Sequence, residues 1–123
     1  MIKIIFHLLN IIFVFLYVYP GSLLGFLIYK DISKQLQLTS DFFISLNHMY
    51  AFIILSILGI ISYNNNKIKI LFLYLFIISI ALELCHILIP KRSFEYSDLF
   101  GNFSGVFLIF ILFNLYQFFK GDK

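Results

Sequence analysis

Hydrophobic positions along this chain form four long runs, separated by short polar stretches. The first run is interrupted at Pro20-Gly21, and the runs cover residues 4–29, 42–63, 70–89 and 99–119. A helix that crosses a bilayer needs about 20 mostly apolar residues. The pattern therefore predicts an all-α membrane protein, a bundle of four transmembrane helices with short loops, in a single domain over residues 1–123.

The ends of the runs carry local signals. A proline lacks the backbone N–H and pushes the preceding residue out of helical geometry, so the first run is predicted to break at Pro20. Residues 21–29 then either complete a tilted helix or lie at the membrane interface. Ser40 or Asp41 is expected to cap the second helix, since a side-chain oxygen there accepts from free backbone N–H groups. Residues 63–69 are predicted to form a tight polar turn.

Composition supports the membrane assignment. The chain is 62% hydrophobic and only 12% charged, whereas soluble domains average roughly 25% charged residues. Its net charge of +3 would suggest nucleic-acid binding in a soluble protein. Here the basic residues stand at the ends of apolar runs, where they act as topology signals and contact lipid headgroups. We therefore expect membrane lipids as partners, and no nucleic acid.

The basic residues also predict an orientation. Four spans put both termini and the 64–69 turn on one side, and the 30–41 and 91–98 loops on the other. The first side has Lys3, Lys67, Lys69, Lys120 and Lys123, and the second has Lys30, Lys34, Lys91 and Arg92. Cytoplasmic loops are enriched in Lys and Arg. This excess of one residue favours both termini in the cytoplasm.

Polar side chains with chemical potential gather on the second of these sides. Glu83 and His86 are three residues apart, so they share one helix face near its end. An ionisable residue inside a span must be paired, protonated or face a cavity, and it marks a site by default. The same topology brings further polar residues to this side, and the predicted binding residues are His48, Glu83, His86, Arg92, Asp98 and Asn102.

Three kinds of function fit these residues. In a binding module, the planar guanidinium of Arg92 would hold an anionic lipid or envelope-precursor headgroup, with Glu83 and His48 as hydrogen-bonding partners. In an enzyme, Glu83 or His48 would be the general base acting on a lipid-linked substrate. In a structural protein, the cluster would only lock the helices together. No cofactor is expected.

Smaller motifs add to this reading. Glu-x-x-His is half of a di-iron motif, but one copy is present, so a metal site of His48, Glu83 and His86 is a minor alternative. Asp98 is expected to cap the last helix and is near enough in sequence to pair with Arg92. Gly101-x-x-x-Gly105 forms a small-residue seam that lets another helix approach closely, with Asn102 pointing inward beside it.

The motifs together resemble the VanZ-like family of small bacterial membrane proteins, from about residue 41 to residue 115. The resemblance is carried by His48 with the apolar run after it, by Glu83, by Ile89-Pro90-Lys91-Arg92 and by the Asp98, Asn102 and Gly105 spacing. Two departures stand out. His86 replaces the usual Gln of the family, and the Asp-Lys pair usually found a turn before the His is represented only by Asp41, farther upstream.

This resemblance implies a four-span bacterial membrane protein. The prototype of the family is associated with low-level resistance to the glycopeptide antibiotic teicoplanin, and most members have no assigned activity. The family pattern thus implies an architecture and a set of polar residues, but no reaction.

Overall fold

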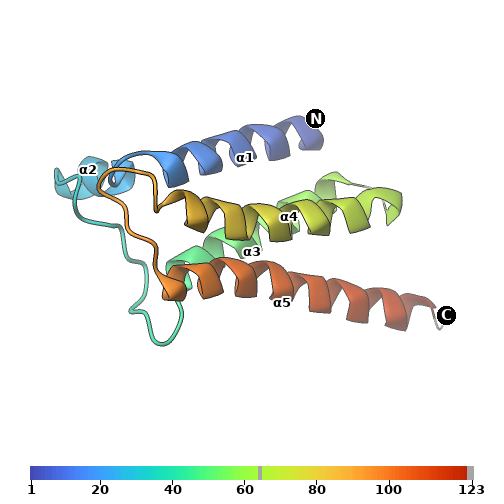
Figure 1. Cartoon of the computed structure of the whole chain (residues 1–123). Helices are drawn as coiled ribbons and strands as arrows, with labels where there is room; N and C mark the ends of the chain where they lie inside the picture. Colours follow the sequence, from blue (N-terminus) through green and yellow to red (C-terminus); the bar gives the residue numbers. More distant parts are fainter. Residues whose placement is uncertain (64, 122–123) are drawn as a thin grey trace.

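The computed structural model describes residues 1–63 and 65–121, and over these ranges the chain has helices and no strands. Four long helices run back and forth between two ends of a bundle, and both termini lie at the same end (Figure 1). The all-α class is confirmed. The helices are α1 (Ile2–Val18), the short α2 (Leu23–Tyr29), α3 (Leu46–Ser62), α4 (Asn65–Cys85) and α5 (Tyr96–Gly121).

The chain breaks at Pro20, as the sequence predicts. Tyr19, which precedes the proline, has extended backbone angles of φ −66° and ψ 133°. Gly21 has φ 95°, a conformation that glycine adopts without steric penalty. The Ser22 hydroxyl then caps α2 by accepting from the Gly25 N–H at 2.9 Å. Helix α2 is bent by 82° from α1, so residues 21–29 do not complete a tilted first helix.

Helix α3 begins later than predicted. Its first residue is Leu46 and its N-cap is Ser45, so neither Ser40 nor Asp41 occupies the cap position. The Asp41 carboxylate nevertheless accepts from the Leu46 N–H at 2.9 Å, from four residues upstream of the cap. Since this bond satisfies a free donor at the helix start, the residues between Asp41 and Ser45 remain outside the helix.

Helix α4 is displaced toward the N-terminus relative to its predicted range of 70–89. It begins at Asn65, so most of the predicted polar turn at 63–69 is helical, and residue 64 lies outside the described residues. It ends at Cys85, after which the His86 N–H bonds to the Glu83 carbonyl at 3.1 Å. A proline ring clashes with the carbonyl four residues earlier in a helix, so Pro90 prevents α4 from continuing past His86.

Helix α5 begins three residues earlier than its predicted start at residue 99. The Glu95 carbonyl accepts from the N–H groups of Asp98 and Leu99, at 3.1 and 3.0 Å. Asp98 therefore lies inside the first turn of α5. The prediction that Asp98 caps this helix is wrong. A carboxylate in the first turn is favourable because the helix dipole is positive there.

The core lies where α3, α4 and α5 meet. Phe52, Leu75 and Val106 come from these three helices and have no exposed surface. Gly105 lets α3 and α5 approach, because a Cβ there would lie 2.5 Å from the Met49 carbonyl oxygen, and a Cβ at Gly101 would collide with the Ser45 carbonyl. The predicted glycine seam is thus confirmed, and its partner is α3 of the same chain.

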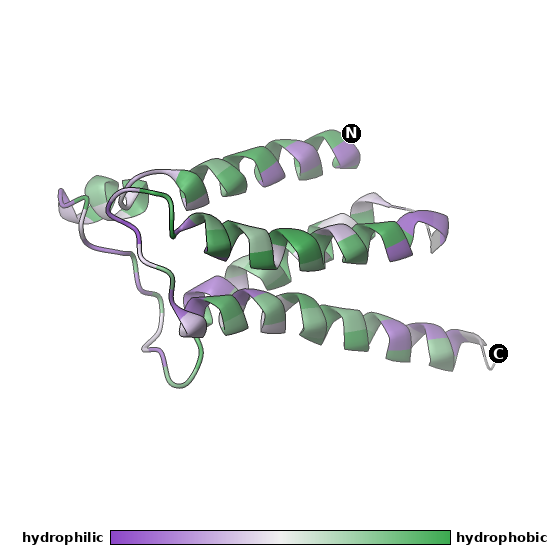
Figure 2. Ribbon diagram, viewed as in Figure 1, coloured by the Kyte–Doolittle hydropathy of each residue, from purple (hydrophilic) through white to green (hydrophobic). Residues whose placement is uncertain are grey.

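Long apolar stretches cover the outside of the helices, while polar residues collect at their ends (Figure 2). Within the described residues, α4 and α5 are long and apolar enough to cross a membrane. The bent pair α1 and α2 makes a third candidate if it forms one span, and α3, with 17 residues, is shorter. By length and composition, two or three helices can therefore span a bilayer.

Candidate functional site

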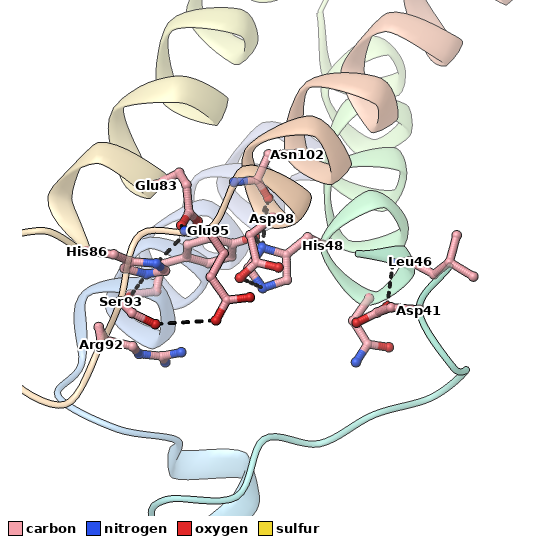
Figure 3. A network of polar contacts seen from close by, with 12 residues as sticks. Asp41, Leu46, His48, Glu83, His86, Arg92, Ser93, Glu95, Asp98 and Asn102 are labelled. Atoms are coloured by element: carbon pink, nitrogen blue, oxygen red, sulfur yellow. Dashed lines mark hydrogen bonds and ion pairs between the residues drawn. The ribbon is translucent and has the colours of Figure 1, made fainter. Parts of the chain in front are cut away.

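The six predicted site residues come together at the end of the bundle that lies away from the termini (Figure 3). His48 stands in the first turn of α3, Glu83 in the last turn of α4, and Asp98 and Asn102 in the first two turns of α5. His86 and Arg92 belong to the connection between α4 and α5. The convergence expected from the sequence is confirmed.

Glu83 and His86 form a buried pair. Glu83 has no exposed surface and His86 is 2% exposed, and the Glu83 Oε2 atom lies 3.2 Å from His86 Nδ1. His86 Nε2 lies 3.0 Å from the Tyr17 carbonyl oxygen, which can only accept, so the hydrogen on this ring resides at Nε2. Glu83 Oε1 accepts from the Glu95 N–H at 3.0 Å, which connects α4 to the start of α5.

Asn102 occupies the centre of a second group. Its amide nitrogen donates to the Ser79 carbonyl at 3.2 Å, and this contact fixes which end of the amide is oxygen. The Asn102 Oδ1 atom then accepts from the Tyr17 hydroxyl at 2.6 Å and lies 3.1 Å from His48 Nδ1. Asn102 is fully buried, as predicted.

Arg92 does not pair with Asp98 or with Glu83 in the described part of the chain. Its guanidinium donates instead to the carbonyls of Leu16 and Tyr19, at 3.2 and 3.3 Å. These carbonyls are left free where α1 ends at the Pro20 break, and a cation at a helix C-terminus is favourable. Burial lowers the pKa of Arg92, while nearby Tyr17, Asp98 and Glu83 act in the opposite direction.

The six predicted site residues are called the polar cluster below. This cluster borders a cavity of about 210 Å³ between α1, α2, the 30–41 loop and α3. Its ionisable lining side chains are Tyr17, His48, His86 and Arg92, whereas the carboxylates of Glu83 and Asp98 do not line it. A larger cavity of about 350 Å³ lies at the opposite end of the bundle, beside His7 and Asn10, and includes none of the cluster residues. Of these two cavities, the smaller one is therefore lined by predicted site residues, namely His48, His86 and Arg92.

Tyr17 also belongs to this site, although no motif in the sequence identified it. Its hydroxyl contacts His48 and Asn102, its carbonyl contacts His86, and its ring stacks on the His86 ring at 5.8 Å. One signal could have identified it. Tyr17 stands three residues before Pro20, where the first run is interrupted, and the topology places this break beside the other six residues.

The expected minor metal set of His48, Glu83 and His86 is not the one that the fold assembles. The ligand atoms that lie within 4.8 Å of one another belong to His48, Glu83 and Asp98. Each of these three residues comes from a different helix.

Comparisons of this chain with family models, with curated proteins and with solved structures gave no match.

Proposed function

We propose that this chain is a VanZ-like integral membrane protein of the bacterial inner membrane, and that it binds the anionic headgroup of a lipid or cell-envelope precursor. The observation that carries this proposal is the lining of the 210 Å³ cavity, which has one guanidinium and two imidazoles and no carboxylate. Such a lining favours a negatively charged group. Ligand sites for drug-sized molecules measure about 300–1,000 Å³. This cavity is smaller, so it suits a headgroup better than a larger molecule.

Arg92 has donors to spare for such a group. A guanidinium carries five N–H groups, which match the oxygens of phosphate or carboxylate. Only the Nε and Nη2 atoms donate to the α1 carbonyls, so further N–H groups remain for a ligand. The contacts with α1 also hold the guanidinium in place, which reduces the entropy lost when a ligand binds.

In the membrane, we propose that the chain makes four spans. The bent pair of α1 and α2 forms the first span, and α3, α4 and α5 form the other three. Helix α3 has 17 residues, or about 25 Å at 1.5 Å per residue, which is near the lower limit for a span. Both termini are placed in the cytoplasm by the excess of one Lys or Arg on their side, and the polar cluster then faces outward.

The VanZ-like assignment is supported by the sequence motifs and by where their residues lie. His48 contacts both Asp98 and Asn102, and Glu83 is connected to them through His86 and Tyr17. Arg92 lines the cavity of about 210 Å³ together with His48. Gly105, the last residue of the pattern, lets α5 approach α3. The motifs thus correspond to one site.

Thermal unfolding of the purified full chain in a neutral detergent tests the headgroup proposal. Phosphatidylglycerol is added as the anionic lipid, phosphatidylcholine as the zwitterionic control, and inorganic phosphate as the free anion. We expect a higher melting temperature with phosphatidylglycerol. A shift with phosphate alone would assign the cavity to a soluble anion, and no shift with either anion would contradict the proposal.

A pair of variants locates the binding. Ala51 lines the cavity, whereas Ala81 is exposed on α4 and does not. Ala51→Leu fills part of the cavity and replaces none of the side chains of the polar network, so it should remove the lipid-dependent shift. Ala81→Leu is the same change at a control position and should preserve it.

An enzyme that uses Glu83 and His48 is the second candidate. It is favoured by one observation, the 3.2 Å contact of Glu83 with His86. Because His86 also lines the cavity, its imidazole could pass a proton between the Glu83 carboxylate and a substrate in the cavity. Glu83→Gln separates the candidates. Loss of lipid turnover with retained lipid binding supports an enzyme, and loss of membrane abundance and thermal stability alone supports a structural role.

A further inference from the structure

Three side chains that are able to bind a metal meet at the base of the polar cluster (Figure 3). His48 from α3, Glu83 from α4 and Asp98 from α5 each offer one ligand atom, and these atoms lie within 4.8 Å of one another. The side chains are 13%, 0% and 14% exposed, respectively. Two carboxylates and an imidazole are thus held together in a largely buried space.

The hydrogen bonds determine which nitrogen of His48 is free. Tyr17 has a single hydroxyl hydrogen, and its 2.6 Å contact with Asn102 Oδ1 requires it, since the amide oxygen only accepts. His48 Nδ1 lies 2.9 Å from the Tyr17 oxygen and 3.1 Å from Asn102 Oδ1, so Nδ1 must supply its own hydrogen. In the neutral ring, His48 Nε2 then carries no hydrogen and has a free lone pair. This atom lies 3.5 Å from Asp98 Oδ2.

Glu83 presents a similar arrangement. Its Oε2 atom is buried and has no hydrogen-bond partner among the described residues. The nearest ring nitrogen, His86 Nδ1, is 3.2 Å away, but the hydrogen of that ring is used at Nε2 toward the Tyr17 carbonyl. No Lys or Arg nitrogen within the described ranges lies within 4.0 Å of Glu83 or Asp98. These carboxylates therefore lack a fixed positive partner.

We propose that His48, Glu83 and Asp98 bind a divalent transition-metal ion, with His48 Nε2 and one oxygen of each carboxylate as ligands. One nitrogen and two carboxylate oxygens suit Zn²⁺ or Mn²⁺ better than Ca²⁺ or Mg²⁺, which prefer oxygen alone. With bonds of about 2.0–2.2 Å, ligand atoms lie roughly 3–4 Å apart, so the side chains close by about 1 Å around the ion.

Asn102 supports this site from outside. A metal-bound histidine commonly donates its other ring N–H to a carbonyl, which fixes the ring and the nitrogen that carries the hydrogen. Asn102 Oδ1 has this position next to His48 Nδ1, and Asn102 is itself oriented by the Ser79 carbonyl. The metal neutralises the two carboxylates and leaves a coordination position open. Of the three metal ligands, His48 also lines the cavity of about 210 Å³, whereas Glu83 and Asp98 do not, so substitutions of the two carboxylates test the metal site without changing the lining of the cavity.

The test uses the full chain in detergent, freed of metal with a chelator, and titrated calorimetrically with ZnCl₂ and MnCl₂, with CaCl₂ as the oxygen-preferring control. We expect about one transition-metal ion per chain. Glu83→Gln and Asp98→Asn should abolish this binding, and Asn102→Ala should weaken it by about 10–100-fold. His7→Gln is the matched histidine control, since His7 lies at the other end of the bundle beside Tyr63, and it should bind as the unmodified chain does.

A second measurement uses only the unmodified chain and so does not depend on whether the variants fold. Co²⁺ bound through His48 and two carboxylates gives a visible absorption band that excess Zn²⁺ removes. Absence of this band together with absence of binding heat for Zn²⁺ and Mn²⁺ would overturn the proposal, as would folded Glu83→Gln and Asp98→Asn variants that bind as tightly as the unmodified chain.

Discussion

The Tyr17 hydroxyl donates to Asn102 Oδ1 at 2.6 Å, which joins the end of α1 to the start of α5. Asn102 also donates to the Ser79 carbonyl on α4 and contacts His48 on α3. One buried amide therefore connects the four long helices at the end where the polar cluster lies. The same contacts that hold the helices together position the imidazole of His48 beside the cavity.

Removing the Tyr17 hydroxyl should loosen this connection. Tyr17→Phe removes the shortest hydrogen bond of Asn102 Oδ1 and leaves this oxygen with only the 3.1 Å contact to His48 Nδ1, and a hydrogen bond of this kind contributes about 0.5–1.5 kcal/mol. We expect a lower free energy of unfolding in detergent by that amount. Tyr19→Phe is the control, because no hydrogen bond of the Tyr19 hydroxyl is present in the described residues, and equal stability of the two variants would contradict the role of Tyr17.

The close approach of α3 and α5 predicts a large effect at Gly105. In Gly105→Ala, the new Cβ would lie 2.5 Å from the Met49 carbonyl oxygen and 2.9 Å from the Phe52 Cβ, so the helices must move apart. Overpacking of this kind costs about 1–3 kcal/mol. Gly121→Ala adds the same methyl group at a position with no heavy atom within 4 Å and should be tolerated. Thermal unfolding of both variants decides the point.

Arg92 should protect the last turn of α1. Arg92→Gln shortens the side chain and removes the charge that the Leu16 and Tyr19 carbonyls contact, so we expect faster amide hydrogen exchange near Tyr19, by about 1 kcal/mol of local opening free energy. Lys34→Gln removes a charge from the exposed loop and should leave the exchange of α1 unchanged. Unchanged exchange in Arg92→Gln would show that the guanidinium does not stabilise the end of α1.

The two substitutions His86→Gln and His86→Leu separate hydrogen bonding from packing. Gln retains a donor for the Tyr17 carbonyl, whereas Leu leaves that carbonyl without the donor at His86 and leaves Glu83 Oε2 without its imidazole neighbour. We expect Leu to lower the free energy of unfolding by about 1–3 kcal/mol more than Gln does. If Leu were as stable as Gln, the Tyr17 contact would contribute nothing to the fold.

The sequence predicted the helical class and the convergence of the polar residues, because four apolar runs and their alternating direction determine which loops share an end. It did not locate the helix ends. Four of the residues 65–69 are polar, and yet the segment is helical, since polarity marks where a chain leaves an apolar region and not where its helix stops. Helix α3 starts late for a different reason, which is the reach of the Asp41 carboxylate to the Leu46 N–H.

The roles of Arg92 and Tyr17 depend on the tertiary structure. Arg92 contacts carbonyls that become free only because α1 ends before Pro20, and those backbone groups leave no trace in a motif. Tyr17 is one of eight tyrosines, and the signal along the chain that sets it apart is its place three residues before the Pro20 break. The closeness of Arg92 and Asp98 in sequence allowed the two to pair, but Arg92 donates to backbone carbonyls at the end of α1 instead.

Native mass spectrometry of the chain released from bacterial membranes tests the central claim most directly, since it identifies any lipid that stays bound. We predict that an anionic lipid or lipid-linked phosphate remains on the unmodified chain and on Ala81→Leu, and that it is lost from Ala51→Leu, whose new side chain enters the cavity. Release of the unmodified chain free of lipid, or equal retention by all three proteins, would contradict the assignment of the cavity beside Arg92 as a headgroup site.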